Sequence, residues 1–243
     1  MKTEFYNLII LDESGSMGGV ADSTISGCNE TLNTIRSSQR KFNDSQTHYV
    51  SIFAFQSDSN IPSRYLVKNE PIGEVRDINA ELYRPYGMTP LYDALGSTLA
   101  DLKTVVKDKE LAVGNVTIIT DGMENASLHY SQEKVVKMIS ALKELGWSFN
   151  FIGADIDVET TARSLNIDNH MKFSKTTHGI AKMFACEQSS RERWYTRMAE
   201  ATQCFAAPPE TQAEKDALYE SRRAVSTGYF EEDEAQDEKD EKK

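Results

Sequence analysis

Short apolar segments alternate along this chain with amphipathic ones, and each kind predicts its own element. Residues 5–11 (FYNLIIL), 115–120 (NVTIIT) and 147–152 (WSFNFI) are apolar runs too short for buried helices, and they are typical of strands covered on both faces. Residues 47–55 and 63–67 predict two more strands joined by a short polar connection, which favours an antiparallel hairpin. Residues 171–173 are expected to form a last edge strand.

Apolar positions three and four residues apart mark the helices. In residues 90–106, Leu91, Leu95, Leu99 and Leu102 fall on one face, with Pro90 in the first turn. The same kind of reading gives the other expected helices, which are 22–42, 131–145, 157–165 and 177 to about 197. The order of elements predicts an α/β fold with a doubly wound, mostly parallel central sheet, one antiparallel edge strand and helices on both faces.

The chain is expected to divide into three regions. Residues 1–200 hold all the elements of the sheet and form one domain. Residues 201–229 are a C-terminal extension, with a further helix expected over 210–223 after the prolines at 208 and 209. Residues 230–243 are an acidic, low-complexity tail that is too polar to order itself.

The 243 residues carry a net charge of −11, and the segment 231–243 alone holds eight acidic residues against three lysines. Such a balance disfavours binding to nucleic acid phosphates. Cys28, Cys186 and Cys204 are far apart and odd in number, which argues against a disulfide framework or a zinc knuckle. The N-terminus lacks a signal-like apolar core and no stretch approaches the roughly 20 apolar residues of a membrane span, so we expect a cytoplasmic protein without membrane contact.

Oxygen-bearing side chains gather on three predicted loops. Asp12, Ser14 and Ser16 follow the first strand, Thr89 precedes a helix, and Asp121 follows the strand 115–120. Any one of these loops alone is typical of caps and turns. Together they offer two carboxylates and three hydroxyls at the edge where parallel sheets bind ligands, without a histidine or cysteine. This donor set favours Mg²⁺, with Mn²⁺ or Ca²⁺ as alternatives, and it leaves the ion able to bind an outside carboxylate.

The D-x-S-x-S element at residues 12–16, Thr89 in a G-x-T-P context and Asp121 in T-D-G resemble the complete metal-ion-dependent adhesion site of von Willebrand factor A domains. The resemblance covers roughly the first three quarters of the chain, and it is most similar to the cytosolic bacterial or phage members. It implies that the hydroxyls of Ser14, Ser16 and Thr89 contact the ion, and that Asp12 and Asp121 act directly or through water.

The other polar residues near these loops are assigned structural roles. Glu13 is expected to be a solvated loop residue, and Glu124 and Asn125 a turn. Asp155 and Asp157 are expected to support the site or cap a helix. The four histidines lack ligand spacing and are assigned surface or packing roles; they are His48, His129, His170 and His178.

The favoured function is a non-enzymatic, metal-dependent protein-binding module whose ion recruits an Asp or Glu side chain of a partner protein. The alternative is a magnesium-dependent phosphoryl hydrolase of the haloacid dehalogenase type. That chemistry needs a second Asp where Ser14 stands, and a lysine, which is absent from the sequence around Asp121. A third hypothesis is self-interaction, in which the acidic segment 231–241 places a carboxylate on the metal of its own or a neighbouring molecule. The favoured interpretation of this segment is a tail that only keeps the protein soluble.

Overall fold

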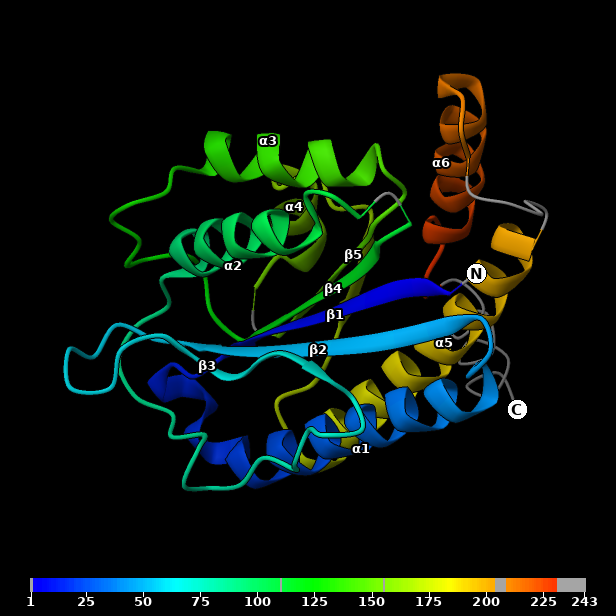
Figure 1. Ribbon diagram of the computed structural model, residues 1–243. Helices are drawn as coiled ribbons and strands as arrows, with labels where there is room; N and C mark the ends of the chain where they lie inside the picture. The colour runs from blue at the N-terminus through cyan, green and yellow to red at the C-terminus, as the bar shows by residue number, and fades with distance from the viewer. Residues whose placement is uncertain (1, 110, 155, 204–208, 231–243) are drawn as a thin grey trace, which may run out of the picture.

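A six-stranded sheet runs through the middle of the molecule, with helices packed on both of its faces (Figure 1). The computed structural model describes residues 2–109, 111–154, 156–203 and 209–230. The strands lie in the order β3-β2-β1-β4-β5-β6. Their bounds are Thr3–Asp12 for β1, Gln46–Phe55 for β2, Arg64–Pro71 for β3, Val113–Thr120 for β4, Ser148–Gly153 for β5 and Asn169–Lys172 for β6.

All the strand pairings are parallel except that of β3, which runs antiparallel to β2 at one edge of the sheet. The predicted fold class is therefore confirmed. Strand β3 is longer than predicted and continues to Pro71, because a polar edge strand open to solvent shows no apolar signal over its last residues. β1 and β4 are neighbours at the centre, so Asp12 and Asp121 lie at adjacent strand ends.

Helices cover both faces of the sheet, as the alternation of elements predicted. Helices α2, α3 and α4 lie on one face, and α1 and α5 lie side by side on the other (Figure 1). The bounds are Ala21–Lys41 for α1, Leu91–Val106 for α2, Gln132–Lys143 for α3, Val158–Ser164 for α4, Thr177–Gln203 for α5 and Gln212–Ser226 for α6. A 3-10 helix, η1, over Gly15–Val20 leads directly into α1, where a plain loop was expected.

The two faces hold separate apolar cores. One lies between the sheet and α1 and α5, around Leu11, Leu32 and Phe184, and the other lies under α2, α3 and α4, around Ile10, Leu95 and Phe151. Every residue of β4 is buried, as expected for a central strand covered on both sides.

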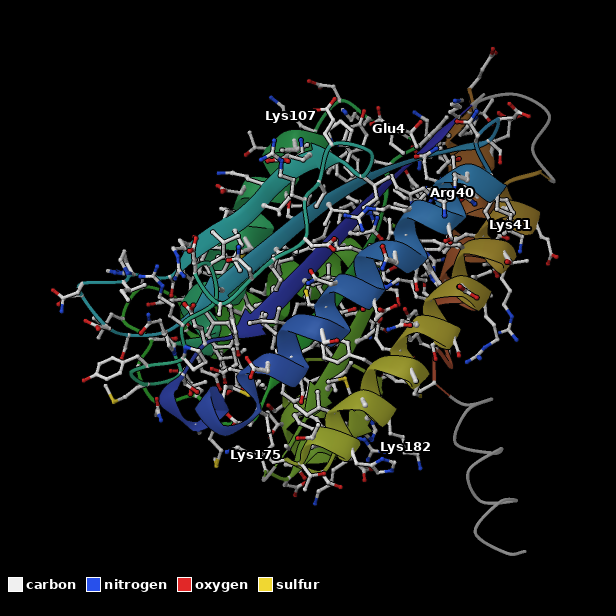
Figure 2. All side chains as sticks on the ribbon, turned by 90° about the horizontal axis from the view of Figure 1, so that it is seen from below. Glu4, Arg40, Lys41, Lys107, Lys175 and Lys182 are labelled. Atoms are coloured by element: carbon white, nitrogen blue, oxygen red, sulfur yellow. The ribbon has the colours of Figure 1, made fainter. Side chains whose placement is uncertain are left out.

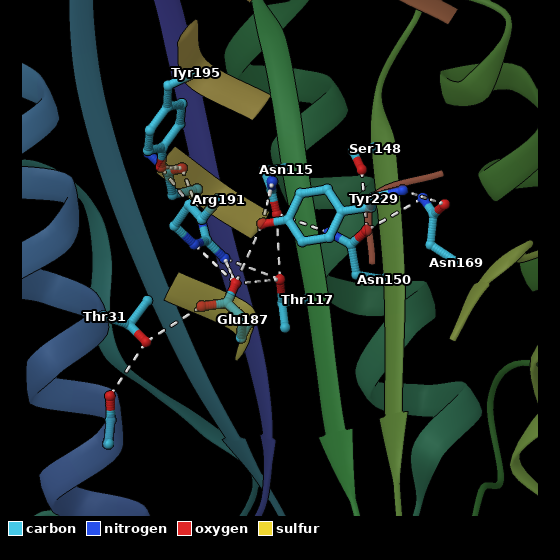
Figure 3. A network of polar contacts seen from close by, with 12 residues as sticks. Thr31, Asn115, Thr117, Ser148, Asn150, Asn169, Glu187, Arg191, Tyr195 and Tyr229 are labelled. Atoms are coloured by element: carbon cyan, nitrogen blue, oxygen red, sulfur yellow. Dashed lines mark hydrogen bonds and ion pairs between the residues drawn. The ribbon is translucent and has the colours of Figure 1, made fainter. Parts of the chain in front are cut away.

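Polar groups inside the first core join α5 to the sheet (Figure 3). Glu187 and Arg191, four residues apart on α5, are both buried and form an ion pair of 2.6 Å. Arg191 donates to the side-chain oxygen of Asn7 on β1 and to the hydroxyl of Thr117 on β4. Tyr195 donates to the same oxygen of Asn7. The pairing leaves both charges compensated although they are out of contact with water.

The chain after α5 returns to the body. Helix α6 places Arg222 in a buried position where it donates to the carbonyl oxygens of Leu111 and Ala112. Tyr229 and Phe230 are buried too, and the amide of Asn115 donates to the Tyr229 hydroxyl at 3.2 Å. The region 201–229, expected as an extension with one helix, thus packs on the first core through its described residues. Residues 231–243, which make up nearly all of the predicted tail, lie outside the described residues.

Candidate metal centre

Asp12, the first predicted ligand, ends β1 and is completely buried. One of its carboxylate oxygens, Oδ1, accepts a hydrogen bond of 2.7 Å from the backbone N–H of Ser14, and the other, Oδ2, accepts one of 2.5 Å from the hydroxyl of Thr120. The first bond folds the loop after β1 back on itself, and the second ties β1 to the end of β4. Asp12 is therefore held in one orientation by both central strands.

Ser14, Ser16 and Asp121 form the centre of the site. The hydroxyl oxygens of Ser14 and Ser16 are 3.0 Å apart, and the Ser16 hydroxyl donates to the Asp121 carboxylate at 2.6 Å. The turn of η1 brings the two serines together, since it begins at Gly15, between them. Two of the three loops that were predicted to meet therefore do meet through side-chain contacts.

Thr89 comes from the third loop and lies against the Asp121 loop. Its backbone N–H donates to the Asn125 side chain at 2.9 Å, and its carbonyl oxygen accepts from the Asn125 backbone at 3.2 Å. A Cβ built on Gly122 would come within 2.8 Å of the Thr89 hydroxyl oxygen, so glycine is needed beside Asp121 for this approach. Within the described part of the chain, the Thr89 hydroxyl has no hydrogen-bond partner, which leaves it available to a ligand.

The donor set fits a hard dication. All five side chains offer oxygen, the ligand type that Mg²⁺, Mn²⁺ and Ca²⁺ share. Neighbouring oxygens around an octahedral Mg²⁺ lie about 2.9 Å apart, which is close to the 3.0 Å between the hydroxyls of Ser14 and Ser16. Among the described residues, no three His, Cys, Asp or Glu side chains cluster to hold a metal. With only two carboxylates, the candidate centre belongs to a different type, in which hydroxyls supply most of the ligands.

A lysine from the C-terminal half of the chain contacts the candidate centre. Lys175 follows β6, and its ammonium lies 2.6 Å from Oδ2 of Asp121, whose side chain is 0% exposed. Figure 2 shows Lys175 at the start of α5, at the same end of the molecule as the carboxyl end of β1. The sequence around Asp121 contains no lysine, but the fold brings Lys175, from 54 positions later in the chain, beside this carboxylate. Lys175 could have been found by applying the strand-end rule to β6 as well.

Glu13 is buried, and the expectation of a solvated loop residue is therefore wrong. Its carboxylate forms a two-pronged ion pair with Arg64, with N–O distances of 2.6 and 3.0 Å, and accepts from the backbone N–H of Arg84. Tyr83 is buried beside it, and its hydroxyl donates to the carbonyl oxygen of Asp12 at 2.6 Å. Glu13 and Tyr83 thus connect the metal loop to β3 and to the segment before Thr89.

Burial raises the pKa of Asp12 to about 6, and the nearby charge of Asp121 adds to this shift. The bonds from Thr120 and Ser14 act in the opposite direction but do not cancel it. The protein alone therefore stabilises the ionised form of Asp12 only weakly. A dication beside the carboxylate would supply the missing positive charge.

The remaining sequence candidates have structural roles in the described chain. Glu124 accepts hydrogen bonds from the backbone of Tyr92 in the first turn of α2 and of Ser127 in its own loop, which is more than the simple turn that was expected. Asp157 caps α4 by accepting from Thr160, and Asp155 lies outside the described residues. His48 is buried and stacks on Phe5, in agreement with a packing role.

No protein-family model matches this chain, and no curated protein matches it in sequence. Solved structures resemble it in fold. The pilus adhesin SpaC from Lactobacillus rhamnosus GG aligns over 80% of this chain and 31% of its own, with a TM-score of 0.58 and 13% identity. A von Willebrand factor type A structure from Catenulispora acidiphila aligns over 79% of this chain and 43% of its own, with a TM-score of 0.48 and 14% identity. The manganese-loaded TRAP protein of Plasmodium vivax aligns over 75% and 73%, with a TM-score of 0.46 and 20% identity.

At these identities a likeness shows the fold alone, and the chain spans about a third of the length of SpaC. Within the described part of the chain, no helix is long and apolar enough to cross a membrane. The sheet order with its single antiparallel edge strand and the likeness to SpaC together support a doubly wound, mostly parallel α/β fold.

Proposed function

We propose that this protein is an interaction module that holds a divalent cation through Asp12, Ser14, Ser16, Thr89 and Asp121, and that the cation binds an acidic side chain of a partner protein. The observation that carries the proposal is the contact of two hydroxyls and a carboxylate from separate loops, with O–O distances of 3.0 and 2.6 Å. Mg²⁺ is the expected ion, with Mn²⁺ and Ca²⁺ as alternatives.

The charges of the centre explain why the ligand would be an acid. Asp12 and Asp121 bring two negative charges, which a dication cancels, and Lys175 adds one positive charge 2.6 Å from Asp121. The loaded centre therefore carries a net positive charge. A carboxylate from a partner would neutralise this charge and fill a coordination position that the hydroxyls leave open.

The first test is direct binding of Mn²⁺ and Mg²⁺, measured by titration calorimetry and by thermal unfolding with and without a chelator. We expect saturable binding with a stoichiometry of one and a rise in melting temperature. Ser16→Ala should weaken binding at least tenfold, whereas Ser26→Ala, which changes an exposed serine of α1, should not. Equal metal affinity in the two variants would show that the ion does not bind at the candidate centre, and would contradict the proposal.

One observation favours the hydrolase alternative, because Lys175 supplies the lysine that the sequence near Asp121 lacks. However, Ser14 stands where that chemistry needs an acid. A phosphate-release assay with Mg²⁺ separates the two functions, and we expect no turnover. Turnover that disappears in Asp12→Asn would replace the binding module by an enzyme.

A further inference from the structure

Large apolar side chains are exposed around the candidate metal centre. In the described part of the chain, six large hydrophobic residues are exposed, and five of them lie on the loops at the carboxyl edge of the sheet; the five are Leu82, Tyr86, Met88, Met123 and Leu128, and the sixth is Leu145. Isolated exposed hydrophobic residues are ordinary, but a group gathered around one site marks a binding surface.

Three of these side chains are next to the predicted ligands. Tyr86 is 63% exposed, and its backbone N–H donates to the carbonyl oxygen of Glu13, between Asp12 and Ser14. Met88, at 53%, precedes Thr89, and Met123, at 67%, follows Gly122, which lies against the Thr89 hydroxyl. These three residues, which we call the apolar rim, are exposed on the same loops that carry the predicted ligands or are hydrogen-bonded to those loops.

A hollow of about 490 Å³ lies next to the rim, since Ser57, which lines the hollow, accepts the backbone N–H of Met88. Its apolar wall is formed by Phe53, Tyr65, Pro90, Ala94, Leu128 and Tyr130, and Pro90 is the residue after Thr89. Asp93 and Asp101 also line the hollow. Asp101 is already paired with Lys68 at 2.7 Å, and Asp93 accepts hydrogen bonds from backbone N–H groups. The apolar wall therefore suits an apolar side chain of a ligand.

The backbone beneath this surface is held by specific bonds. The N–H of Met88 donates to the Ser57 hydroxyl at 2.8 Å, and the N–H of Leu128 donates to Asp93 at 2.8 Å. Gly87 has a φ of +73° and carries the chain between Tyr86 and Met88. The exposed side chains therefore stand on a fixed frame, and the flexible methionines can adapt to different apolar partners.

We propose that the partner segment carries a large apolar residue within a few positions of its acidic residue, so that the acid binds the ion while the apolar side chain packs on the rim and in the hollow. This inference rests on the proposed function and names the class of ligand. An ion contact alone is exposed to water and selects only for charge. Burial of apolar surface beside it supplies both affinity and selectivity.

The test is a selection of random linear peptides displayed on phage against the Mn²⁺-loaded protein, with elution by a chelator. Enriched peptides are expected to contain Asp or Glu close to Leu, Ile, Phe, Met or Trp. The affinity of one enriched peptide is then measured for the wild type and for Met88→Ser with Met123→Ser. We expect a loss of at least tenfold for this double variant, and at most twofold for the matched control Leu145→Ser, which changes the exposed apolar residue outside the carboxyl-edge loops.

The outcomes separate the two proposals. Enriched peptides that are acidic without an apolar neighbour, or that bind the double variant as tightly as the wild type, overturn this inference and leave the metal-dependent module standing. A selection that yields no peptide released by chelator overturns both. Thermal unfolding of each variant shows that the fold is intact, as expected for changes at exposed side chains.

Discussion

Lys175 gives the most direct test of the electrostatics of the centre. Its ammonium lies 2.6 Å from Asp121, so the carboxylate already has a cationic partner before any metal binds. A dication must bind against this positive charge. We therefore expect Lys175→Met to bind Mn²⁺ and Mg²⁺ more tightly than the wild type, although it loses a polar contact.

The size of the effect follows from the distance. An ion ligated by Asp121 lies about 2 Å from the carboxylate oxygen, which puts it on the order of 5 Å from the lysine nitrogen. At that separation an ammonium and a dication repel by about 1.7 kcal/mol in the dielectric of water, and by more in the protein. Removal of the charge should therefore raise metal affinity by at least about tenfold.

The assay is calorimetric titration with Mn²⁺ at about 0.15 M salt, where long-range charge effects are screened. Lys175→Arg keeps the charge and should stay within twofold of the wild type. Lys107→Met makes the same change at an exposed lysine far from the centre (Figure 2) and should have no effect. Without metal, Lys175→Met should also melt at a lower temperature, because the buried Asp121 loses its counter-charge. An unchanged or weaker metal affinity in Lys175→Met would refute the reasoning.

Three further predictions concern ligands, pH and the core. Thr89→Ala should weaken Mn²⁺ binding at least tenfold, while the melting temperature without metal changes little, because this hydroxyl has no partner in the described chain. Ser14→Ala should weaken Mn²⁺ binding similarly, and it should cost about 1 kcal/mol of stability because one hydrogen bond is lost. Metal affinity should fall about tenfold per pH unit below pH 6 in titrations across that range, because the pKa of Asp12, raised to about 6, makes a proton compete with the ion. The free energy of unfolding of the metal-free protein should change in the opposite direction. A carboxyl with a raised pKa stabilises this fold at low pH, and the contribution is lost as the pH rises to about 6. Arg191→Met should cost about 3–5 kcal/mol in denaturant unfolding, because Glu187 would remain buried without its partner, and a change below 1 kcal/mol would contradict the role of this ion pair.

Most of the fold could be predicted from the sequence, because its strands and helices have distinct apolar periods. Residues 115–120 are apolar enough to be assigned to a buried strand, and the structure places them at the centre of the sheet. The weak points are edges and ends. The prediction ended the β3 strand at residue 67, because the residues from 68 to 71 are polar or exposed at the edge of the sheet. Helix α5 extends past the predicted end at about residue 197, to Gln203.

The candidate site divides in the same way. Asp12 ends a central strand, and Ser14, Ser16 and Asp121 follow central strands, so the rule on parallel strand ends was sufficient to bring the four together. Their buried partners could not be predicted, since they depend on contacts between residues far apart in the chain. Glu13 looks like an ordinary loop acid until Arg64 is seen to pair with it across 51 positions.

The polar contacts of α5 have a consequence for how the chain acquires its structure during synthesis. All six strands are complete by Lys172, yet Asn7 and Thr117 receive hydrogen bonds from Arg191, which is made later. Until α5 has emerged from the ribosome, these central-strand groups would either remain open to water or be sealed in without partners, at a cost of about 1–3 kcal/mol each. We therefore expect the face of the nascent sheet that α5 covers to stay accessible to water. The domain would reach its packed native state only when the last quarter of the polypeptide has been synthesised.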